Sequence, residues 1–202
     1  MGRPVPLEDV ELIEQVKAGK TECYGRLVEK YQDRVFNVCW RICGHLEDAR
    51  DVTQEAFLKA LDGISAFRQH SGFYTWVFRV AVNLALSQRR KAKIRQTTSL
   101  DATVDPFGSQ AEALARRVQD DSSEDPSGAA ARAELHGRMA LALQELHDDY
   151  RAVVVLRDIE GLDYSEISEV LQIPVGTVRS RLYRGRMALR ETVMPAAKKP
   201  QG

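Results

Sequence analysis

Residues 164–189 read YSEISEVLQIPVGTVRSRLYRGRMAL, and this stretch decides the fold of the C-terminal part of the chain. Asp163 followed by Glu166 has the spacing of a capping box, so we expect a short helix over residues 164–171. A turn at residues 172–174 separates it from a longer helical segment. A short helix, a tight turn and a second helix together predict a helix-turn-helix.

The second of these helices has one apolar stripe and one polar, basic face. Residues at three- and four-residue spacing predict the stripe, which consists of Val175, Val178, Leu182, Gly185 and Leu189. Outside it lie Thr177, Arg179, Ser180, Tyr183 and Arg184. Arg reads guanine edges in the major groove, and Ser and Thr bond phosphates or bases. A merely solvated helix usually interleaves Glu with Arg. No acid occurs between residues 170 and 190, so we predict that this face contacts duplex DNA.

Helical periodicity continues through most of the remaining sequence, without an alternating strand pattern. In the N-terminal part it predicts a short helix that ends at Gly19 and helices at residues 21–42, 47–61 and 74–93. In the C-terminal part, helices around residues 131–146 and 150–159 precede the helix-turn-helix. The predicted fold class is all-α, with two small helical domains joined by an acidic flexible linker.

The linker is indicated by its composition. TTSLDATVDPFGSQ and DDSSEDPSGAAA are rich in Ser, Asp, Gly, Pro and Ala and poor in large apolar residues, so they cannot offset the entropy of folding alone. We therefore expect an N-terminal helical domain at 1–96, the linker at 97–130, the helix-turn-helix domain at 131–195 and a tail at 196–202.

The charges of the chain are segregated, although its 29 basic and 29 acidic side chains balance. Residues 63–100 contain seven basic residues and no acid, whereas residues 101–134 contain eight acids and three arginines. Blocks of opposite charge indicate separate partners, so overall neutrality does not argue against nucleic-acid binding.

A second candidate DNA site combines aromatic rings with cations in the stretch FRQHSGFYTW, residues 67–76. Aromatic faces beside Arg suit unstacked, single-stranded bases, and an extruded base needs a pocket of this kind. The alternative is an ordinary aromatic core at the start of a helix. The residues concerned are Phe67, Phe73, Tyr74 and Trp76, with Arg68 and Arg79.

Asp48, Asp51, Gln54 and Glu55 share the polar face of the helix predicted at residues 47–61. Such faces are usually only solvated, but acidity next to a basic domain also suits a docking surface for a protein. Paired carboxylates raise the possibility of acid-base or metal chemistry. However, no third ligand stands at a useful spacing, and the sequence has neither a Gly-rich phosphate loop nor a nucleophile motif. We expect no enzyme activity, cofactor or metal.

The cysteines Cys23, Cys39 and Cys43 make an odd count, which is a poor disulfide framework and predicts a reducing, cytoplasmic environment. Cys39 falls on the apolar stripe of its helix, which favours a core position. No run approaches the about 18 apolar residues of a membrane span. The N-terminus is acidic and amphipathic, unlike a signal peptide. We therefore expect no membrane insertion.

Three stretches resemble the extracytoplasmic-function (ECF) sigma factors, which are promoter-specificity subunits of bacterial RNA polymerase. These stretches are DARDVTQEAFLKAL, FRQHSGFYTWVFRVAVN and YSEISEVLQIPVGTVRSRLYRGRMAL, and they occur in the family's order. The resemblance implies a non-catalytic factor that binds core RNA polymerase and promoter DNA, both duplex and single-stranded. It also implies regulation by an anti-sigma factor.

The resemblance further implies roles for individual residues. Core polymerase would be bound by Asp48, Asp51, Gln54 and Glu55. The minus-ten element would be melted and read by Phe67, Arg68, Ser71, Phe73, Tyr74, Trp76, Arg79 and Asn83. The minus-thirty-five element would be read as duplex by Thr177, Arg179, Ser180, Tyr183 and Arg184. The acidic linker would pass through the active-site and RNA-exit channels of the polymerase.

Two other functions remain open on the sequence. A stand-alone helix-turn-helix regulator would explain the arginine-rich helix, but it assigns no function to the aromatic stretch or the acidic face. Duplex binding without polymerase would favour it. A thiol or metal sensor would be centred on Cys39, Cys43 and His45, and metal analysis of the purified protein would test it.

Overall fold

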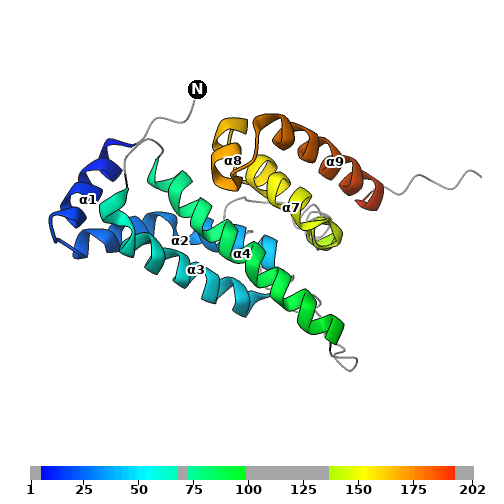
Figure 1. Ribbon diagram of the computed structural model, residues 1–202, viewed down its shortest axis with the longest axis horizontal. Coiled ribbons are helices and arrows are strands. Elements are labelled where there is room, and N and C mark those ends of the chain that lie inside the picture. Colours follow the sequence, from blue (N-terminus) through cyan, green and yellow to red (C-terminus); the bar gives the residue numbers. More distant parts are fainter. Residues whose placement is uncertain (1–5, 68–71, 99–136, 194–202) are drawn as a thin grey trace, which may run out of the picture.

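The computed structural model describes residues 6–67, 72–98 and 137–193, and all regular secondary structure within these ranges is helical (Figure 1). The prediction of an all-α protein is confirmed. Figure 1 shows two groups of helices, α1 to α4 at the N-terminal end of the sequence and α7 to α9 at the C-terminal end.

In residues 6–67 and 72–98, the N-terminal domain forms four α-helices and one turn of 3-10 helix. In chain order these are α1 (Leu7–Lys17), α2 (Glu22–Cys43), α3 (Leu46–Asp62), η1 (Ile64–Ala66) and α4 (Phe73–Thr98). They correspond to the four predicted helices, with boundaries that differ by a few residues.

The helix ends show which local signals act as predicted. Gly44 ends α2 in the left-handed conformation, with φ 84°, and its amide donates to the carbonyl of Trp40 at 2.8 Å. Thr21 stands at the N-cap position of α2, but its side chain forms no capping hydrogen bond. The helix α4 continues past the predicted end at Lys93 to Thr98, because residues 94–98 include neither Gly nor Pro.

The helices α2, α3 and α4 pack around a common core. Its fully buried side chains include Leu27, Val35, Val38, Cys39, Ile42, Phe73, Val77 and Phe78. The helix α1 is joined to α2 through the buried carboxylate of Asp9, which accepts hydrogen bonds from Lys30 Nζ at 2.6 Å and from the Tyr31 hydroxyl. Because a buried charge is costly unless it is paired and hydrogen-bonded, this contact fixes where α1 lies on α2.

The C-terminal domain is built around the predicted helix-turn-helix. A helix at residues 137–145 leads to α7 (Asp148–Val154), which continues as the π-helical segment η3 (Val155–Ile159). The helices α8 (Tyr164–Leu171) and α9 (Val175–Val193) follow. The bounds of α8 agree with those predicted from its capping signal.

The start of α8 is held by the predicted capping box. The Asp163 carboxylate accepts from the amides of Ser165 at 2.8 Å and Glu166 at 2.9 Å, while the Glu166 carboxylate accepts from the Asp163 amide at 2.8 Å. The hydrogen bond from the Glu166 amide is the largest cause of the lowered pKa of Asp163. At the other end, Gln172 adopts a left-handed conformation with φ 54° and lets the chain turn into α9.

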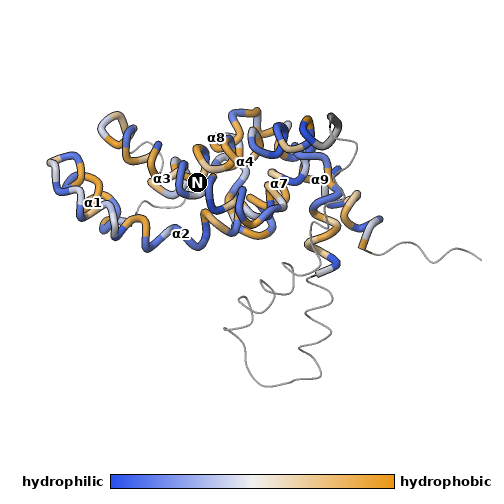
Figure 2. The backbone as a smooth tube through the Cα atoms, turned by 90° about the horizontal axis from the view of Figure 1, so that it is seen from below, coloured by the Kyte–Doolittle hydropathy of each residue, from blue (hydrophilic) through white to orange (hydrophobic). Residues whose placement is uncertain are grey.

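The two domains lie against each other. The helix α4 packs along α8, and α2 contacts α7 and η3 (Figure 1). Figure 2 shows polar and apolar residues alternating along the helices, as expected for amphipathic helices that each bury one side. Most of the predicted linker and the whole tail at 196–202 lie outside the described residues, although α4 includes the first two linker positions.

Gly185 lies where α9 crosses α7. A Cβ atom at this position would lie 2.8 Å from Cγ2 of Val154 and 3.3 Å from Cβ of Tyr150. Glycine therefore permits a close approach of α9 to α7 that no other residue would.

We predict that Gly185→Ala lowers the free energy of unfolding by about 1–3 kcal/mol, because the added methyl group overpacks the contact between α9 and α7. Gly176→Ala is the matched control in the same helix, since a Cβ there has no neighbour within 4 Å. Urea unfolding followed by circular dichroism measures both variants. Equal stability of the two variants would contradict this role of Gly185.

Candidate functional site

The helix α9 buries one stripe and exposes another. Val178, Leu182, Gly185 and Leu189 are buried, while Val175 at the start of the helix is half-buried. The exposed residues include Arg179, Ser180, Tyr183 and Arg184. Thr177 is half-buried, and its carbonyl accepts a hydrogen bond from Ser180 Oγ at 3.0 Å. The structure thus brings the five residues predicted to contact duplex DNA to one side of a single helix.

The four arginines between positions 179 and 186 of α9 divide into two classes. Arg181 pairs with Asp149 of α7 at 2.7 Å, and Arg186 holds Asp158 of η3 through two nitrogens. Within the described part of the chain, no carboxylate pairs with Arg179 or Arg184. The latter two therefore keep their donors for an external ligand, a distinction that the sequence does not show.

Three aromatic residues of the stretch at 67–76 are buried. Phe67, Phe73 and Tyr74 are 6%, 0% and 8% exposed, so their faces are inaccessible to a base in this arrangement. The ring centre of Phe67 lies 4.9 Å from that of Trp76, and the ring of Phe73 lies 5.8 Å from that of Tyr31 in α2. For these three residues the structure supports the alternative of an aromatic core, because the first turn of α4 covers the end of the N-terminal core.

The other residues predicted to bind single-stranded DNA are less buried or lie outside the described residues. Trp76 and Arg79 are half-buried and Asn83 is exposed, and their spacing places them on one side of α4. Arg68 and Ser71 lie outside the described residues.

The predicted docking face on α3 is only partly free. Asp51, Gln54 and Glu55 are exposed, whereas Asp48 is half-buried and accepts a hydrogen bond from Gln88 Nε2 of α4 at 2.7 Å. Asp48 therefore links α3 to α4 in this arrangement.

An apolar groove of about 550 Å³ adjoins this face between α2 and α3, and Gln54 contributes to its lining. Its apolar lining consists of Val28, Phe36, Phe57, Leu58 and Leu61. Leu58 is 56% exposed, and the sequence-based prediction omits it. Its position in the sequence could have indicated this role, because a leucine outside the buried stripe of its helix is exposed and available to a partner.

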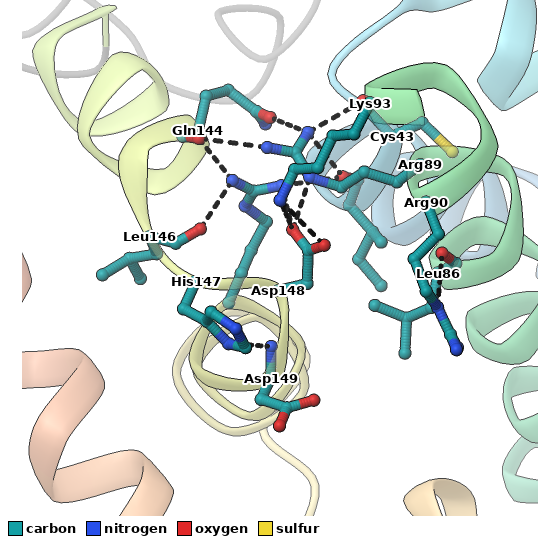
Figure 3. A network of polar contacts seen from close by, with 12 residues as sticks. Cys43, Leu86, Arg89, Arg90, Lys93, Gln144, Leu146, His147, Asp148 and Asp149 are labelled. Carbon is teal, nitrogen blue, oxygen red and sulfur yellow. Dashed lines mark hydrogen bonds and ion pairs between the residues drawn. The ribbon is translucent and has the colours of Figure 1, made fainter. Parts of the chain in front are cut away.

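A polar network joins the two domains at one end of their contact (Figure 3). The Asp148 carboxylate of α7 accepts from Arg89 Nε at 2.6 Å and lies 2.9 Å from Lys93 Nζ, both in α4. Arg89 also donates to the side chain of Gln144 at 2.8 Å. Arg151 of α7 is fully buried and donates to the carbonyl of Leu146 at 2.9 Å.

The same network caps the C-terminal end of α2. The carbonyl of Arg41 accepts from Gln144 Nε2 at 2.8 Å, and that of Ile42 accepts from Arg151 Nη1 at 3.1 Å. The carbonyl of Cys43 accepts from Arg89 Nη1 at 3.1 Å. The last carbonyls of a helix have no partner within it, so side chains from outside α2 complete this end.

A second polar contact joins the domains at the start of α4. The Glu160 carboxylate lies 3.1 Å from Arg34 Nη2 of α2 and accepts from the Tyr74 hydroxyl at 3.0 Å. The guanidinium carbon of Arg34 lies 4.1 Å from the ring centre of Tyr74. Tyr74 is thus held by both domains.

The network shifts the pKa values of its charged groups. Burial and, after it, the neighbouring charge of Arg89 lower the pKa of Arg151 to about 9, and Asp148 opposes this shift. Burial acts to raise the pKa of Asp148, but hydrogen bonds from Lys93 and Arg89 outweigh it, so this pKa lies below its usual value.

The cysteines occupy core positions. Cys23, Cys39 and Cys43 are free and buried, and burial raises the pKa of Cys39 to about 12 and also raises that of Cys43. Because the thiolate is the reactive and metal-binding form, Cys39 and Cys43 are poorly suited to a sensor. Among the residues that the structure describes, no three His, Cys, Asp or Glu side chains are grouped to hold a metal ion. None of the described helices is long and apolar enough to cross a membrane.

Comparison with known proteins identifies the family. Residues 27–94 match sigma-70 region 2, and residues 136–189 match sigma-70 region 4. The chain is 36% identical over 188 residues to the RNA polymerase sigma-H factor of Pseudomonas aeruginosa, covering 93% of this chain and 95% of the relative. It is 37% identical over 179 residues to the ECF RNA polymerase sigma factor SigW of Bacillus subtilis, covering 89% and 93%. The chain belongs to the ECF sigma factors.

Solved structures share the fold of this sigma factor. CnrH, solved in complex with the cytosolic domain of CnrY, is 23% identical, with a TM-score of 0.66 and coverage of 94% of this chain and 99% of CnrH. RpoE of Bartonella quintana, solved with the anti-sigma factor NepR, is 19% identical, with a TM-score of 0.66 and coverage of 86% and 98%. These similarities confirm the predicted fold of two helical domains.

We predict that Asp148→Asn lowers the free energy of unfolding of this sigma factor at neutral pH. The substitution should also make this free energy depend less on pH in the acidic range. The folded-state pKa of Asp148 is lowered, so its contribution is fully present above the unfolded value of about 4 and is lost as the pH falls through the folded pKa. Urea unfolding between about pH 2 and about pH 7 measures this change.

Asp149→Asn is the matched control, because it removes the adjacent carboxylate, which pairs with Arg181 outside the network. If the free energy of unfolding of Asp148→Asn varies with pH as that of wild type does, Asp148 does not stabilise the folded state.

Proposed function

We propose that this sigma factor is a non-catalytic specificity subunit that acts in the cytoplasm. It docks on core RNA polymerase through α3, reads the upstream promoter element with α9 and captures opened strands near the start of α4. The observation that carries the proposal is the exposed side of α9, where Arg179 and Arg184 have no carboxylate partner within the described residues.

Duplex reading is assigned to the exposed side of α9. A guanidinium group bonds guanine O6 and N7 in the major groove, and such a pair discriminates between bases. Thr177 and Ser180 lie near the start of the helix, where backbone N–H groups suit a phosphate. Tyr183, which is 68% exposed, offers an apolar and polar surface to the same groove.

Docking is assigned to the exposed residues of α3 together with the adjoining groove. Asp51, Gln54 and Glu55 provide polar contacts, and Leu58 provides exposed apolar area beside them. A polar rim around an apolar depression is the usual composition of a protein interface. Asp48 already accepts a hydrogen bond from Gln88 through one carboxylate oxygen, so only its remaining acceptor sites are available for docking.

Capture of opened strands is assigned first to Trp76, Arg79 and Asn83, which reach the surface of α4. Phe67, Phe73 and Tyr74 are buried, and Tyr74 is also bonded to Glu160 of the other domain. Their participation therefore requires the start of α4 to rearrange and the domain contact to open. Contacts with polymerase and DNA would have to offset the lost hydrogen bonds.

The acidic composition of residues 101–134 suits passage through channels of the polymerase that otherwise hold nucleic acid.

CnrH and the Bartonella RpoE were each solved with a bound protein, and NepR is an anti-sigma factor. By analogy, we infer that a protein inhibitor regulates this sigma factor.

Reconstituted transcription tests the function as a whole. Core RNA polymerase and the purified chain are incubated with a promoter library, and the start sites are sequenced. We expect initiation downstream of a defined pair of sequence elements. A folded chain that directs no initiation, but binds a duplex site without polymerase, would instead be a stand-alone regulator.

We predict that Arg184→Ala reduces discrimination between matched and mismatched upstream elements by about 1–3 kcal/mol, provided that its contact to guanine is bidentate. Arg186→Ala is the matched control, because that guanidinium is already bonded to Asp158. Transcription from both templates gives the ratio. Equal discrimination in wild type and Arg184→Ala would refute the assignment of Arg184.

We predict that the double variant Gln54→Ala, Glu55→Ala loses binding to core polymerase while its helical content is unchanged, because both side chains are exposed. Co-elution with core polymerase on a sizing column measures binding. The control replaces the exposed Glu11 and Glu22, which lie on α1 and α2, with Ala. Undiminished co-elution of the first variant would count against docking through α3.

A further inference from the structure

Two arginines from different elements share the ring of Tyr164. The guanidinium carbon of Arg157, in η3, lies 5.1 Å from the ring centre, and that of Arg179, in α9, lies 5.6 Å from it. Both distances fall within the about 6 Å over which an aromatic face attracts a cation. Neither Tyr164 nor Arg157 belongs to the set predicted to contact DNA.

The ring has a fixed position. Tyr164 is the first residue of α8 and directly follows Asp163, whose side chain forms the capping box with Glu166. The ring is half-buried and packs against the hydrophobic core. Arg157, which lies over the same ring, is itself held in place, because its Nη1 donates to the carbonyl of Leu162 at 2.7 Å. A ring fixed in this way can orient a neighbouring flexible side chain.

Arg179 is the side chain that needs such orientation. Arg181 and Arg186 are held by Asp149 and Asp158, but no carboxylate among the described residues holds Arg179. A carboxylate would occupy the N–H donors that read a base, whereas a ring attracts the positive charge and leaves those donors available. A side chain held in its bound orientation also loses less rotamer entropy on binding.

We propose that Tyr164 is a positioning residue for sequence readout, whose ring holds the guanidinium group of Arg179 in the orientation that meets the upstream element. This inference rests on the proposed function of Arg179 in duplex reading. It makes an aromatic residue of α8 a determinant of specificity, although its own contact is with protein.

The first experiment tests the contact in the full chain without DNA. The Nε–Hε signals of the arginines are recorded by NMR for wild type, Tyr164→Phe and Tyr164→Leu. We expect a ring-current shift at Arg179 that persists in Tyr164→Phe and disappears in Tyr164→Leu. A signal of Arg179 that is the same in all three proteins would overturn the proposal.

The second experiment tests the consequence with core polymerase and the matched and mismatched upstream elements described above. We expect Tyr164→Leu to reduce the discrimination ratio about two- to fivefold, as for an exposed cation–π contact, and Tyr164→Phe to keep it. In an Arg179→Ala background, Tyr164→Leu should have no further effect, because the two residues act through one contact.

The remaining outcomes are distinguishable. If Tyr164→Phe loses affinity for all sequences and lowers the salt dependence, the hydroxyl binds a phosphate directly and the positioning role is wrong. If Tyr164→Leu lowers the melting temperature but not the ratio, the ring has a structural role only. If wild type itself shows no discrimination while the NMR shift is present, the assignment of α9 to duplex reading fails, and the positioning role fails with it.

Discussion

The buried C-terminal end of α2 needs hydrogen-bond donors that the helix itself cannot supply. The carbonyls of Arg41, Ile42 and Cys43 obtain them from Gln144, Arg151 and Arg89, so one of the three donors comes from α4 and two come from the other domain. Leaving a buried carbonyl without a donor costs about 1–3 kcal/mol, so the hydrogen bonds from Gln144 and Arg151 favour this arrangement of the domains. Once they meet in this way, Asp148 lies against the basic part of α4 and Glu160 lies against its aromatic start.

Ion pairs within the C-terminal domain determine which cations of α9 remain available. A chain with equal numbers of acids and bases could neutralise every cation internally, but the described ion pairs are selective. Asp149 and Asp158 neutralise Arg181 and Arg186, whereas no carboxylate of the described residues pairs with Arg179 or Arg184 on the exposed side of α9. The charge that remains unpaired, and not the net charge of the chain, is what a DNA groove would meet.

The domain contact has a different consequence for the two candidate DNA surfaces. The exposed side of α9 is accessible in this arrangement, so duplex reading requires no change within the C-terminal domain. Phe67, Phe73 and Tyr74 are buried, and Tyr74 is bonded to Glu160, so binding of opened strands by these rings requires a rearrangement. Duplex reading could therefore come first, with the domains in this arrangement. Binding of opened strands would follow, after docking on polymerase had separated the domains.

The sequence by itself determined features that depend on neighbours a few positions apart. The helices, the capping box of Asp163 and Glu166, the left-handed Gly44 and the buried stripe of α9 follow from propensity and periodicity, and the motifs that revealed the family are equally local. The tertiary structure alone decided which arginines of α9 remain unpaired, that Phe73 belongs to the core, and that Leu58 borders a groove. It also joined Arg34 to Glu160 across 126 positions. Contacts of this kind depend on how the helices pack, and an amphipathic pattern specifies which side of a helix is buried but not which partner covers it.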